Sequence, residues 1–429
     1  MRDESRDTTR CERRAGPRRA PWIRLGLALA GLWLAVAPST LRAAPARGDS
    51  TEIELSPAGG TTFPIDVRGN LVYLRGRIND SDSLWMVLDS GAGGNALDEK
   101  IAGSLGLAIG SGGQARGAGG IVQAGRVYGV TLRLPGATLT NARFGTMPLD
   151  AFRLQGGRPM EAILGYPLLS RAVVRVDYLA HTVELLAPEK FEYTGHGTVV
   201  PLTFVSGLPY ITARLTLPGG RAPIEDRFVI DLGSSQALIL SESFVREKRV
   251  LDAVPQTIQN RGRGVGGQVQ SLAGRVGRLE FAGLKIEQPI AVLRTTRQGT
   301  VSAYAGNIGG DILRRFVVIF DYPRQRMILE PNERFGEPFE ADMAGIGMRM
   351  GPEGSGSVQV EWIQPSSPAA EAGLQPDDLI EGVDDRPALD YGVPGLRDLF
   401  RRRSGETHRL SIRRGDTRME ISLTTRRMI

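Results

Sequence analysis

Cysteine and histidine are scarce in this sequence, and their scarcity excludes several kinds of chemistry. The 429 residues include one cysteine, Cys11, and three histidines. Cys11 precedes an apolar run at residues 25–37 that is typical of an export signal, so the processed chain would have no thiol for a disulfide or a nucleophile. No H-E-x-x-H motif occurs. We therefore expect no metal site and no cofactor.

An excess of either charge is also missing from most of the chain. The sequence has 53 Lys and Arg against 47 Asp and Glu, a formal net charge of +6. Ten arginines and four acids fall within residues 1–47, which accounts for the whole excess. Because the remaining chain is balanced, we expect no nucleic-acid partner.

Residues 1–46 have the pattern of a bacterial export signal. An arginine-rich start is followed by the apolar run Leu25–Ala37 and by small residues at Ala43–Ala46. The apolar run has 13 residues, fewer than the roughly 20 that span a bilayer. We predict a periplasmic or secreted protein. The alternative is an uncleaved anchor, which would tether the chain to a membrane.

An internal repeat is the strongest organisational signal. In each copy an apolar run ends in Asp-x-Gly, and a second apolar run with a glycine follows. Asp89 precedes Gly165 by 76 positions, and Asp231 precedes Gly309 by 78. This spacing predicts two lobes with the same fold. The matching segments are WMVLDSGAG (85–93) and RFVIDLGSS (227–235), then ILGYPLLSRAVVRVDY (163–178) and NIGGDILRRFVVIFDY (307–322).

Short apolar runs separated by glycine, proline and asparagine predict a mostly β protein. We expect a signal segment at 1–46, one lobe at 47–192, a second at 193–335 and a small α+β domain at 336–429. The best helix candidate is Leu238–Val250.

The repeated motifs resemble those of aspartic proteases of the retropepsin and pepsin type. The resemblance covers about residues 65–330 and implies that Asp89 and Asp231 meet in a shared cleft, where they activate a water that hydrolyses peptide bonds of polypeptide substrates. Two carboxyl groups held close together share one proton, the behaviour for which aspartic proteases are known. One carboxylate then accepts a proton from water while the other donates to the scissile carbonyl.

The residues that follow each aspartate support this interpretation only in part. Gly91 and Gly233 leave room where two backbones converge. Members of the family usually have Ser or Thr directly after each aspartate to brace the dyad, and Ser90 conforms. Leu232 has no hydroxyl to donate. The alternatives are therefore an aspartic endopeptidase or a catalytically inactive scaffold of the same fold.

Each copy also has a glycine-rich stretch, at 116–120 and 261–267. The resemblance implies hairpins that close over substrate, with plain flexible loops as the alternative. Gly262, Gly264 and Gly267 spell G-x-G-x-x-G, but this stretch follows Gln259-Asn260 and leads into no helical pattern, which argues against a nucleotide site.

The last ninety residues are similar to a bacterial PDZ domain, with the SPAAEAGL run at 367–374 as the most specific part. Ser367, Pro368 and Gly373 are suited to cap, start and end a short helix. The resemblance implies binding of peptide or protein carboxy termini, with the peptide adding a strand; the alternative is a domain that only packs on the lobes. The implied carboxylate-binding loop consists of Gly345, Ile346, Gly347 and Met348.

A serine protease is the other class to consider, since many proteases with PDZ domains are serine enzymes. A serine triad needs a histidine base. His181 and His196 lie near the expected connection between the lobes, and no G-x-S-x-G motif occurs. His408 is interpreted as an ordinary edge residue. We therefore reject this class.

Overall fold

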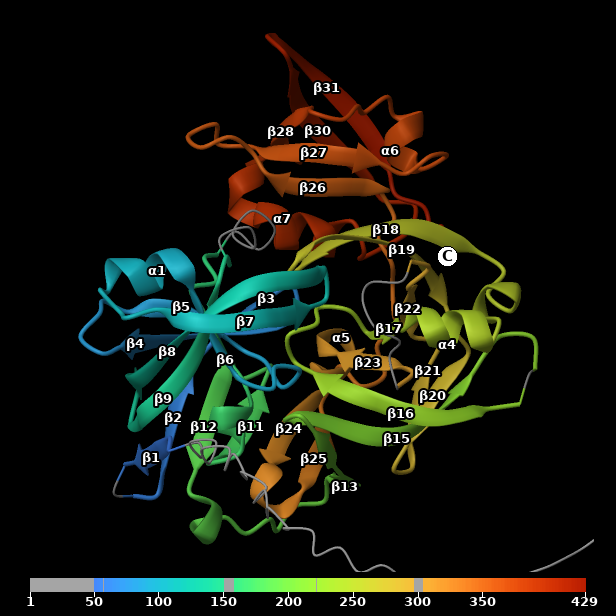
Figure 1. Ribbon diagram of the computed structural model, residues 1–429. Helices are drawn as coiled ribbons and strands as arrows, with labels where there is room; N and C mark the ends of the chain where they lie inside the picture. The colour runs from blue at the N-terminus through green and yellow to red at the C-terminus, as the bar shows by residue number, and fades with distance from the viewer. Residues whose placement is uncertain (1–49, 57, 150–157, 221, 297–303) are drawn as a thin grey trace, which may run out of the picture. The chain divides into compact units, whose positions relative to one another are not determined.

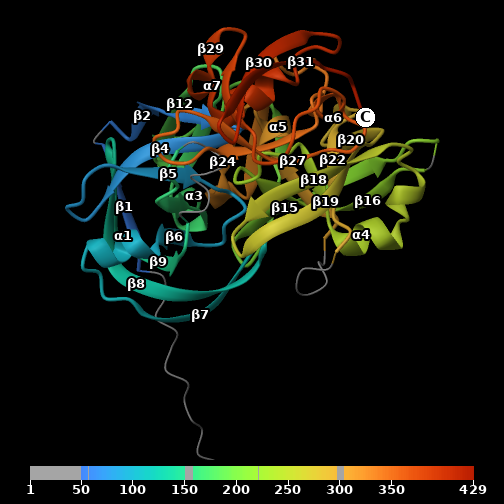
Figure 2. The same ribbon diagram turned by 90° about the horizontal axis from the view of Figure 1, so that it is seen from above.

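Four β-sheets account for most of the described chain, which confirms the mostly β fold expected from the sequence. The computed structural model describes residues 50–429 except 57, 150–157, 221 and 297–303, and Figures 1 and 2 show two views of it. The predicted export signal, residues 1–46, lies outside the described residues. Within the described ranges, none of the helices has the length and apolar character needed to cross a membrane.

The first sheet belongs to lobe 1, and its central strand β5 is buried because it runs between two neighbours. β5 pairs antiparallel with β4 and parallel with β10. Asp98 caps the helix α1 (Glu99–Ser104) by accepting hydrogen bonds from two backbone amides, and α3 (Tyr166–Leu169) follows β10. The strands of this sheet are β1 (Glu52–Leu55), β3 (Asp66–Arg68), β4 (Leu71–Ile78), β5 (Leu84–Leu88), β6 (Asn95–Asp98), β7 (Gly110–Gly117), β8 (Gly120–Leu134), β9 (Ala137–Met147) and β10 (Ala162–Leu164).

The sheet of lobe 2 is arranged in the same way around β16. β16 pairs antiparallel with β15 and parallel with β23. The two helices of this lobe are α4 (Glu242–Glu247) and α5 (Gly310–Leu313). Its strands are β14 (Thr203–Val205), β15 (Leu208–Thr216), β16 (Ile224–Asp231), β17 (Leu238–Leu240), β18 (Thr257–Gly264), β19 (Gly267–Arg275), β20 (Arg278–Phe281), β21 (Leu284–Glu287), β22 (Ile290–Leu293) and β23 (Gly306–Gly309).

The helix predicted over Leu238–Val250 is wrong at both ends. Residues 238–240 form β17, because this apolar run pairs with both β22 and β23. Ser241 then caps α4 by accepting from the amide of Phe244, and a separate 3₁₀ turn covers Val250–Asp252. Tertiary strand pairing overrides the local helical pattern at the start.

A third sheet joins the two lobes. β11 of lobe 1 pairs antiparallel with β24 of lobe 2, with Val174 opposite Phe320 and Val176 opposite Val318. Figure 1 shows green β11 and β12 beside orange β24 and β25. Backbone hydrogen bonds therefore fix the lobes relative to each other. The strands are β2 (Gly60–Pro64), β11 (Val173–Asp177), β12 (Thr182–Leu186), β13 (Thr198–Pro201), β24 (Phe316–Asp321) and β25 (Arg326–Pro331).

The carboxy-terminal domain has a sheet and a hydrophobic core of its own. As expected, Ser367 caps α6 (Pro368–Glu371) by accepting from the amide of Ala370, and Gly373 follows the helix with φ +82°. The longer helix is α7 (Ala388–Leu399). The strands are β26 (Ile346–Met350), β27 (Val358–Ile363), β28 (Leu379–Val383), β29 (Arg386–Pro387), β30 (Thr407–Arg414) and β31 (Thr417–Thr424).

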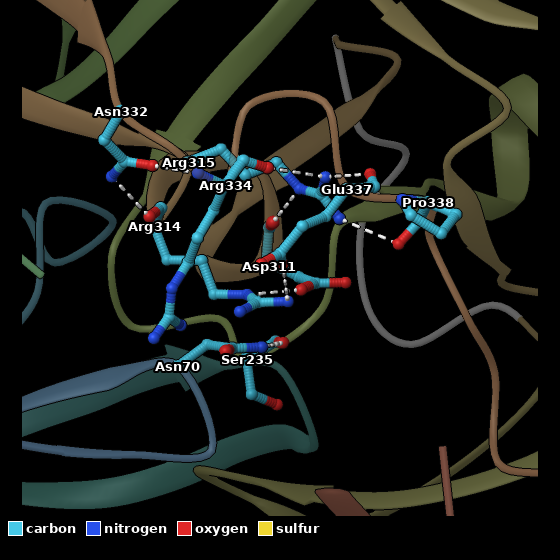
Figure 3. Close-up of polar contacts among 9 residues, drawn as sticks. All are labelled: Asn70, Ser235, Asp311, Arg314, Arg315, Asn332, Arg334, Glu337 and Pro338. Carbon is cyan, nitrogen blue, oxygen red and sulfur yellow. Dashed lines mark hydrogen bonds and ion pairs between the residues drawn. The ribbon is translucent and has the colours of Figure 1, made fainter. Parts of the chain in front are cut away.

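A buried arginine fastens the segment that leads from lobe 2 to this domain (Figure 3). Arg315 is 1% exposed, and its guanidinium donates to the carbonyl oxygens of Arg334, Glu337 and Pro338. It also lies 3.6 Å from the ring centre of Phe339. One planar cation thus satisfies several backbone carbonyls of residues 334–338 at once.

Replacing Arg315 by lysine should destabilise the protein by about 3 kcal/mol, because an ammonium cannot reach all these carbonyls and leaves some of them buried without a donor. The midpoint of urea unfolding measures this. Arg314→Lys is the matched control: Arg314 is partly exposed and pairs with Asp311, so its replacement should cost less than about 1 kcal/mol. Equal losses in the two variants would contradict the assignment.

Candidate active site

The structure brings the two predicted aspartates together at the junction of the lobes. Asp89 directly follows β5, and Asp231 ends β16. A β-carbon built on Gly91 would lie 2.5 Å from Oδ1 of Asp231, and one built on Gly233 would lie 2.4 Å from Oδ2 of Asp89. Each carboxyl group therefore occupies space that only the glycine of the opposite lobe leaves free.

Ser90 braces this junction from one side only. Its hydroxyl, which is buried, donates to the carbonyl oxygen of Ile230 at 2.8 Å and accepts from the amide of Leu232 at 2.9 Å. The matching position in lobe 2 is Leu232 itself, which is fully buried in the core. Half of the brace expected for the family is therefore present, and the other half is replaced by apolar packing.

The two carboxyl groups differ in their electrostatics. Burial raises the pKa of Asp89 well above its usual range, and the negative charge of Asp231 raises it further. Burial also raises the pKa of Asp231, but hydrogen bonds to its carboxylate oppose this rise. The two carboxyl groups therefore share one proton as a coupled pair, and the hydrogen bond that Asn307 donates to Asp231 favours the ionised form of Asp231.

Asn307 supplies the strongest of these opposing contacts. Its side-chain amide donates to Oδ2 of Asp231 at 2.6 Å. Arg294 adds a positive charge that lowers the pKa of Asp231, and burial in turn lowers the pKa of Arg294. The repeat aligns Asn307 with Ile163 of lobe 1, which has no donor, so the asymmetry of the dyad originates in lobe 2.

Two turns cross between the lobes beside the dyad. The turn between β3 and β4 brings Asn70 of lobe 1 to lobe 2, where its side-chain amide donates to the carbonyl oxygen of Ser235 at 2.9 Å (Figure 3). In the opposite direction, the carbonyl oxygen of Ser206 lies 2.4 Å from a β-carbon built on Gly93. These reciprocal contacts hold the aspartates in register.

The two glycine-rich stretches are the tips of long hairpins, and the tips meet. β7 pairs with β8, and β18 lies beside β19 (Figures 1 and 2). The amide of Gly119 donates to the carbonyl oxygen of Val265 at 2.8 Å. A β-carbon at Gly119 or Gly264 would fall within 3 Å of the opposite tip. Glycine is needed here because two backbones touch.

A cavity of about 1060 Å³ contains the site. Both aspartates and both hairpin tips line it, as do the carboxy-terminal domain's Gly345, Ile346, Gly347 and Met348. The dyad and the loop predicted to bind carboxylates therefore open into one space. The aspartates and residues 345–348 share one cavity and do not lie in two separate pockets.

The loop before β26 contains a half-buried acid, Asp342, that the sequence analysis missed. Oδ1 of Asp342 accepts hydrogen bonds from the amides of Ala344 and Gly345. Burial raises the pKa of Asp342, and its Oδ2 has no partner within the described residues. The amide of Gly345 is consequently engaged inside the domain. On the other side of the loop, the ring of Trp362 packs against Gly347.

The histidines do not complete a serine triad. His181 and His196 are exposed. His408 is buried, unlike the edge residue we expected, because β30 runs between β28 and β31. Its Nδ1 lies 2.7 Å from Oδ2 of Asp384, but its Nε2 has no hydrogen-bond partner in the described part of the chain. Among those residues, no group of three or more His, Cys, Asp or Glu could hold a metal.

Asn307, Arg294 and Asp342 are the residues of this site that sequence reasoning missed. The only available signal was the alignment of the two repeats, which places Asn307 opposite Ile163. A polar residue at a position where the other copy has an apolar one indicates a role other than core packing.

The comparisons with known proteins agree with this arrangement. Residues 74–168 match the aspartyl protease family model, and residues 359–414 match the PDZ domain model. The probable CtpA-like serine protease of Staphylococcus haemolyticus (strain JCSC1435) is 29% identical over 97 residues, which are 23% of this chain and 19% of that protein. The chain thus spans about a fifth of the length of this relative.

Among solved structures, the aspartic proteinase from Irpex lacteus is similar with a TM-score of 0.41 and 12% identity, covering 65% of this chain and 99% of that one. The family matches confirm the resemblances seen in the sequence. The chain contains an aspartyl protease segment at residues 74–168 and a PDZ domain at residues 359–414.

Proposed function

We propose that the protein is an aspartic-type endopeptidase with Asp89 and Asp231 as its catalytic pair. The observation that carries this proposal is the reciprocal fit of each carboxyl group over the glycine of the opposite lobe. This fit requires two aspartates and two glycines from distant segments, so simple turn-forming roles for Asp89 and Asp231 do not explain it.

In the proposed reaction a water molecule lies between the two carboxyl groups. The ionised Asp231 accepts a proton from the water while Asp89 donates its proton to the oxygen of the scissile carbonyl. The water oxygen bonds to the carbonyl carbon and forms a diol. The C–N bond then breaks as Asp231 gives its proton to the leaving nitrogen, and Asp89 recovers a proton from a diol hydroxyl, which restores the pair. No covalent intermediate with the protein forms, so no serine or cysteine nucleophile is required.

The unequal sharing of the proton supports these roles. Asn307 donates to Asp231 and so stabilises its ionised form, whereas lobe 1 has Ile163 at the matching position and supplies no such donor for Asp89. The hairpin tips at Gly119 and Val265 cover the cavity, so a substrate has to enter beneath them or part them. Exclusion of water by such a cover strengthens the electrostatic interactions within the site.

A second candidate is a catalytically silent scaffold that works through its PDZ domain, and Leu232 is the observation that favours it. Leu232 provides no hydroxyl for the second half of the brace. The serine protease named among the relatives matches over a fifth of its length, and no histidine of this chain is placed to serve as a triad base, so that chemistry is not carried over.

The proposed role of the PDZ domain is to bind peptide or protein carboxy termini near the cavity. β26 is the edge strand of its sheet, and α7 packs beside it. An added peptide strand would extend this edge. We also propose that the chain is exported to the periplasm or secreted, on the basis of its amino-terminal pattern, and that the two lobes arose by internal duplication.

Asp89→Asn and Asp231→Asn should each lower kcat/KM for casein by at least about 1000-fold, because neither amide can share a proton in the pair. Asp311→Asn is the matched control, since Asp311 lines the same cavity but pairs with Arg314. Folding of each variant is checked by circular dichroism. Full activity in either dyad variant would overturn the assignment of the catalytic pair, and no activity in the folded wild type would favour the scaffold.

Asn307→Ile, which introduces the residue that lobe 1 has at this position, should move the acidic limb of the kcat/KM profile to higher pH. The amide donor favours ionised Asp231, so its loss raises the pKa of that carboxyl. The acidic limb reports ionisation of Asp231 and therefore rises with it. The profile is measured with a peptide that has no titratable group. An acidic limb that stays in place or moves to lower pH contradicts the assigned protonation.

Asp342→Asn should tighten binding of a peptide with a free carboxy terminus several-fold, because it removes a like charge next to the proposed carboxylate-binding loop. Asn keeps an oxygen that accepts from the amides of Ala344 and Gly345. Fluorescence anisotropy measures the affinity, and the amidated form of the same peptide is the control. If both forms tighten equally, the effect does not come from the carboxylate.

A further inference from the structure

Strand register pairs equivalent positions of the two lobes that line the same cavity, and each lobe's set of lining residues is named the pocket of that lobe. In each lobe, residues directly opposite one another on four neighbouring strands have side chains on one face of the sheet. Met147, at the end of β9 beside β6, corresponds to Arg294, which directly follows β22 beside β17. Met160 and Tyr304 correspond because each lies two residues before the next matching strand, β10 or β23. The facing series are Tyr73, Val87, Ile163 and Ala96 in lobe 1 and Tyr210, Val229, Asn307 and Ile239 in lobe 2.

The lobe 1 pocket is apolar. Its residues form a buried hydrophobic cluster that includes Met147, Met160 and Ile163, and all three also line the central cavity. Val265, from the hairpin tip of lobe 2, packs against this cluster. The pocket is suited to an apolar side chain of the substrate.

The lobe 2 pocket has the same position but different chemistry. Arg294, Tyr304 and Asn307 all line the cavity where lobe 1 has Met147, Met160 and Ile163. The ring of Tyr304 packs edge-on against Tyr210 at 5.5 Å between ring centres, so two phenol side chains stand together in the cavity wall.

Arg294 has no dedicated partner in this pocket. Among the described residues, no carboxylate pairs with its guanidinium, and Asp231 is the acidic group whose charge acts on it. A half-buried arginine costs free energy unless an anion compensates it. The shared proton leaves one negative charge on the dyad, and Asn307 already donates to that carboxylate. The guanidinium therefore remains free to bind an incoming carboxylate in bidentate geometry.

We propose that the lobe 2 pocket, formed by Arg294, Tyr304 and Asn307, accepts an acidic side chain of the substrate, so that cleavage occurs between an apolar and an acidic residue. This inference rests on the proposed peptidase function for cleavage, but the pocket's selectivity for a carboxylate can be measured by binding alone. It predicts that acidic segments of polypeptides are the preferred substrates.

The test uses four quenched-fluorescent peptides that are identical except at the two residues flanking the scissile bond: Leu-Glu, Leu-Gln, Glu-Leu and Gln-Leu. Both orders are included so that the glutamate reaches the lobe 2 pocket in one of them, whichever direction the substrate strand takes through the cavity. The same four sequences are also made as uncleavable hydroxyethylene analogues, and their affinities are measured by fluorescence anisotropy. Wild type, Arg294→Met and Arg126→Met are compared. Arg126 is an exposed arginine that lines the same cavity from lobe 1.

In wild type, one glutamate peptide should exceed its glutamine counterpart at least tenfold in kcat/KM and in affinity of the analogue. Arg294→Met should reduce this ratio to about one, whereas Arg126→Met should preserve it. Selectivity should also fall as pH is lowered through about 4.3, where a peptide glutamate becomes protonated.

The outcomes separate this inference from the peptidase proposal. Hydrolysis of all four peptides at equal kcat/KM would support a peptidase and overturn the acidic preference. Arg294-dependent selective binding without any hydrolysis would support the pocket and overturn the peptidase. A tenfold preference that survives Arg294→Met but is lost in Arg126→Met would overturn the assignment to lobe 2, and no hydrolysis together with unselective binding would overturn both proposals.

Discussion

The contact between two carboxyl groups from different lobes is the constraint on which the rest of this structure depends. Like charges at this separation repel unless one proton is shared, and the carboxyls fit only because Gly91 and Gly233 lack a β-carbon. Backbone pairing between β11 and β24 holds the lobes together at the base, and Ser90 ties them at the dyad itself. The fold thus stabilises a juxtaposition that is unfavourable by itself.

The two lobes share geometry but differ in chemistry. Lobe 1 contributes the hydroxyl brace at Ser90 and apolar side chains around the dyad. Lobe 2 has Leu232 where the second brace belongs, and places Asn307 and Arg294 beside its aspartate. The amide of Asn307 and the positive charge of Arg294 favour the ionised form of Asp231. The lobe that lacks the second hydroxyl is therefore also the lobe that stabilises its carboxylate electrostatically. The reaction proposed above needs one acid and one base, so it does not require the two lobes to be equal.

The sequence predicted the β architecture, the paired motifs and the glycines, because each depends on a local pattern that recurs. It failed where distant contacts decide. Residues 238–240 are a strand since two neighbouring strands pair with them. Asn307 and Asp342 act through hydrogen-bond partners that only the folded chain identifies. Without the strand register, the sequence does not distinguish them from ordinary surface residues. The family matches cover residues 74–168 and 359–414 but not lobe 2. The equivalence of lobe 2 to lobe 1 therefore rests on its sheet topology and on the repeated motifs.

The connection to the PDZ domain determines how the two units can cooperate. A flexible tether would let the domain raise only the local concentration of a bound chain. Here Arg315 fastens residues 334–338, and Arg275 donates to the carbonyl oxygens of Phe339 and Ile429. The β26 loop and the dyad line one cavity. A chain end bound at that loop, as proposed, would therefore lie in the same cavity as the dyad, and the fastened connection would limit how far the two units can move apart.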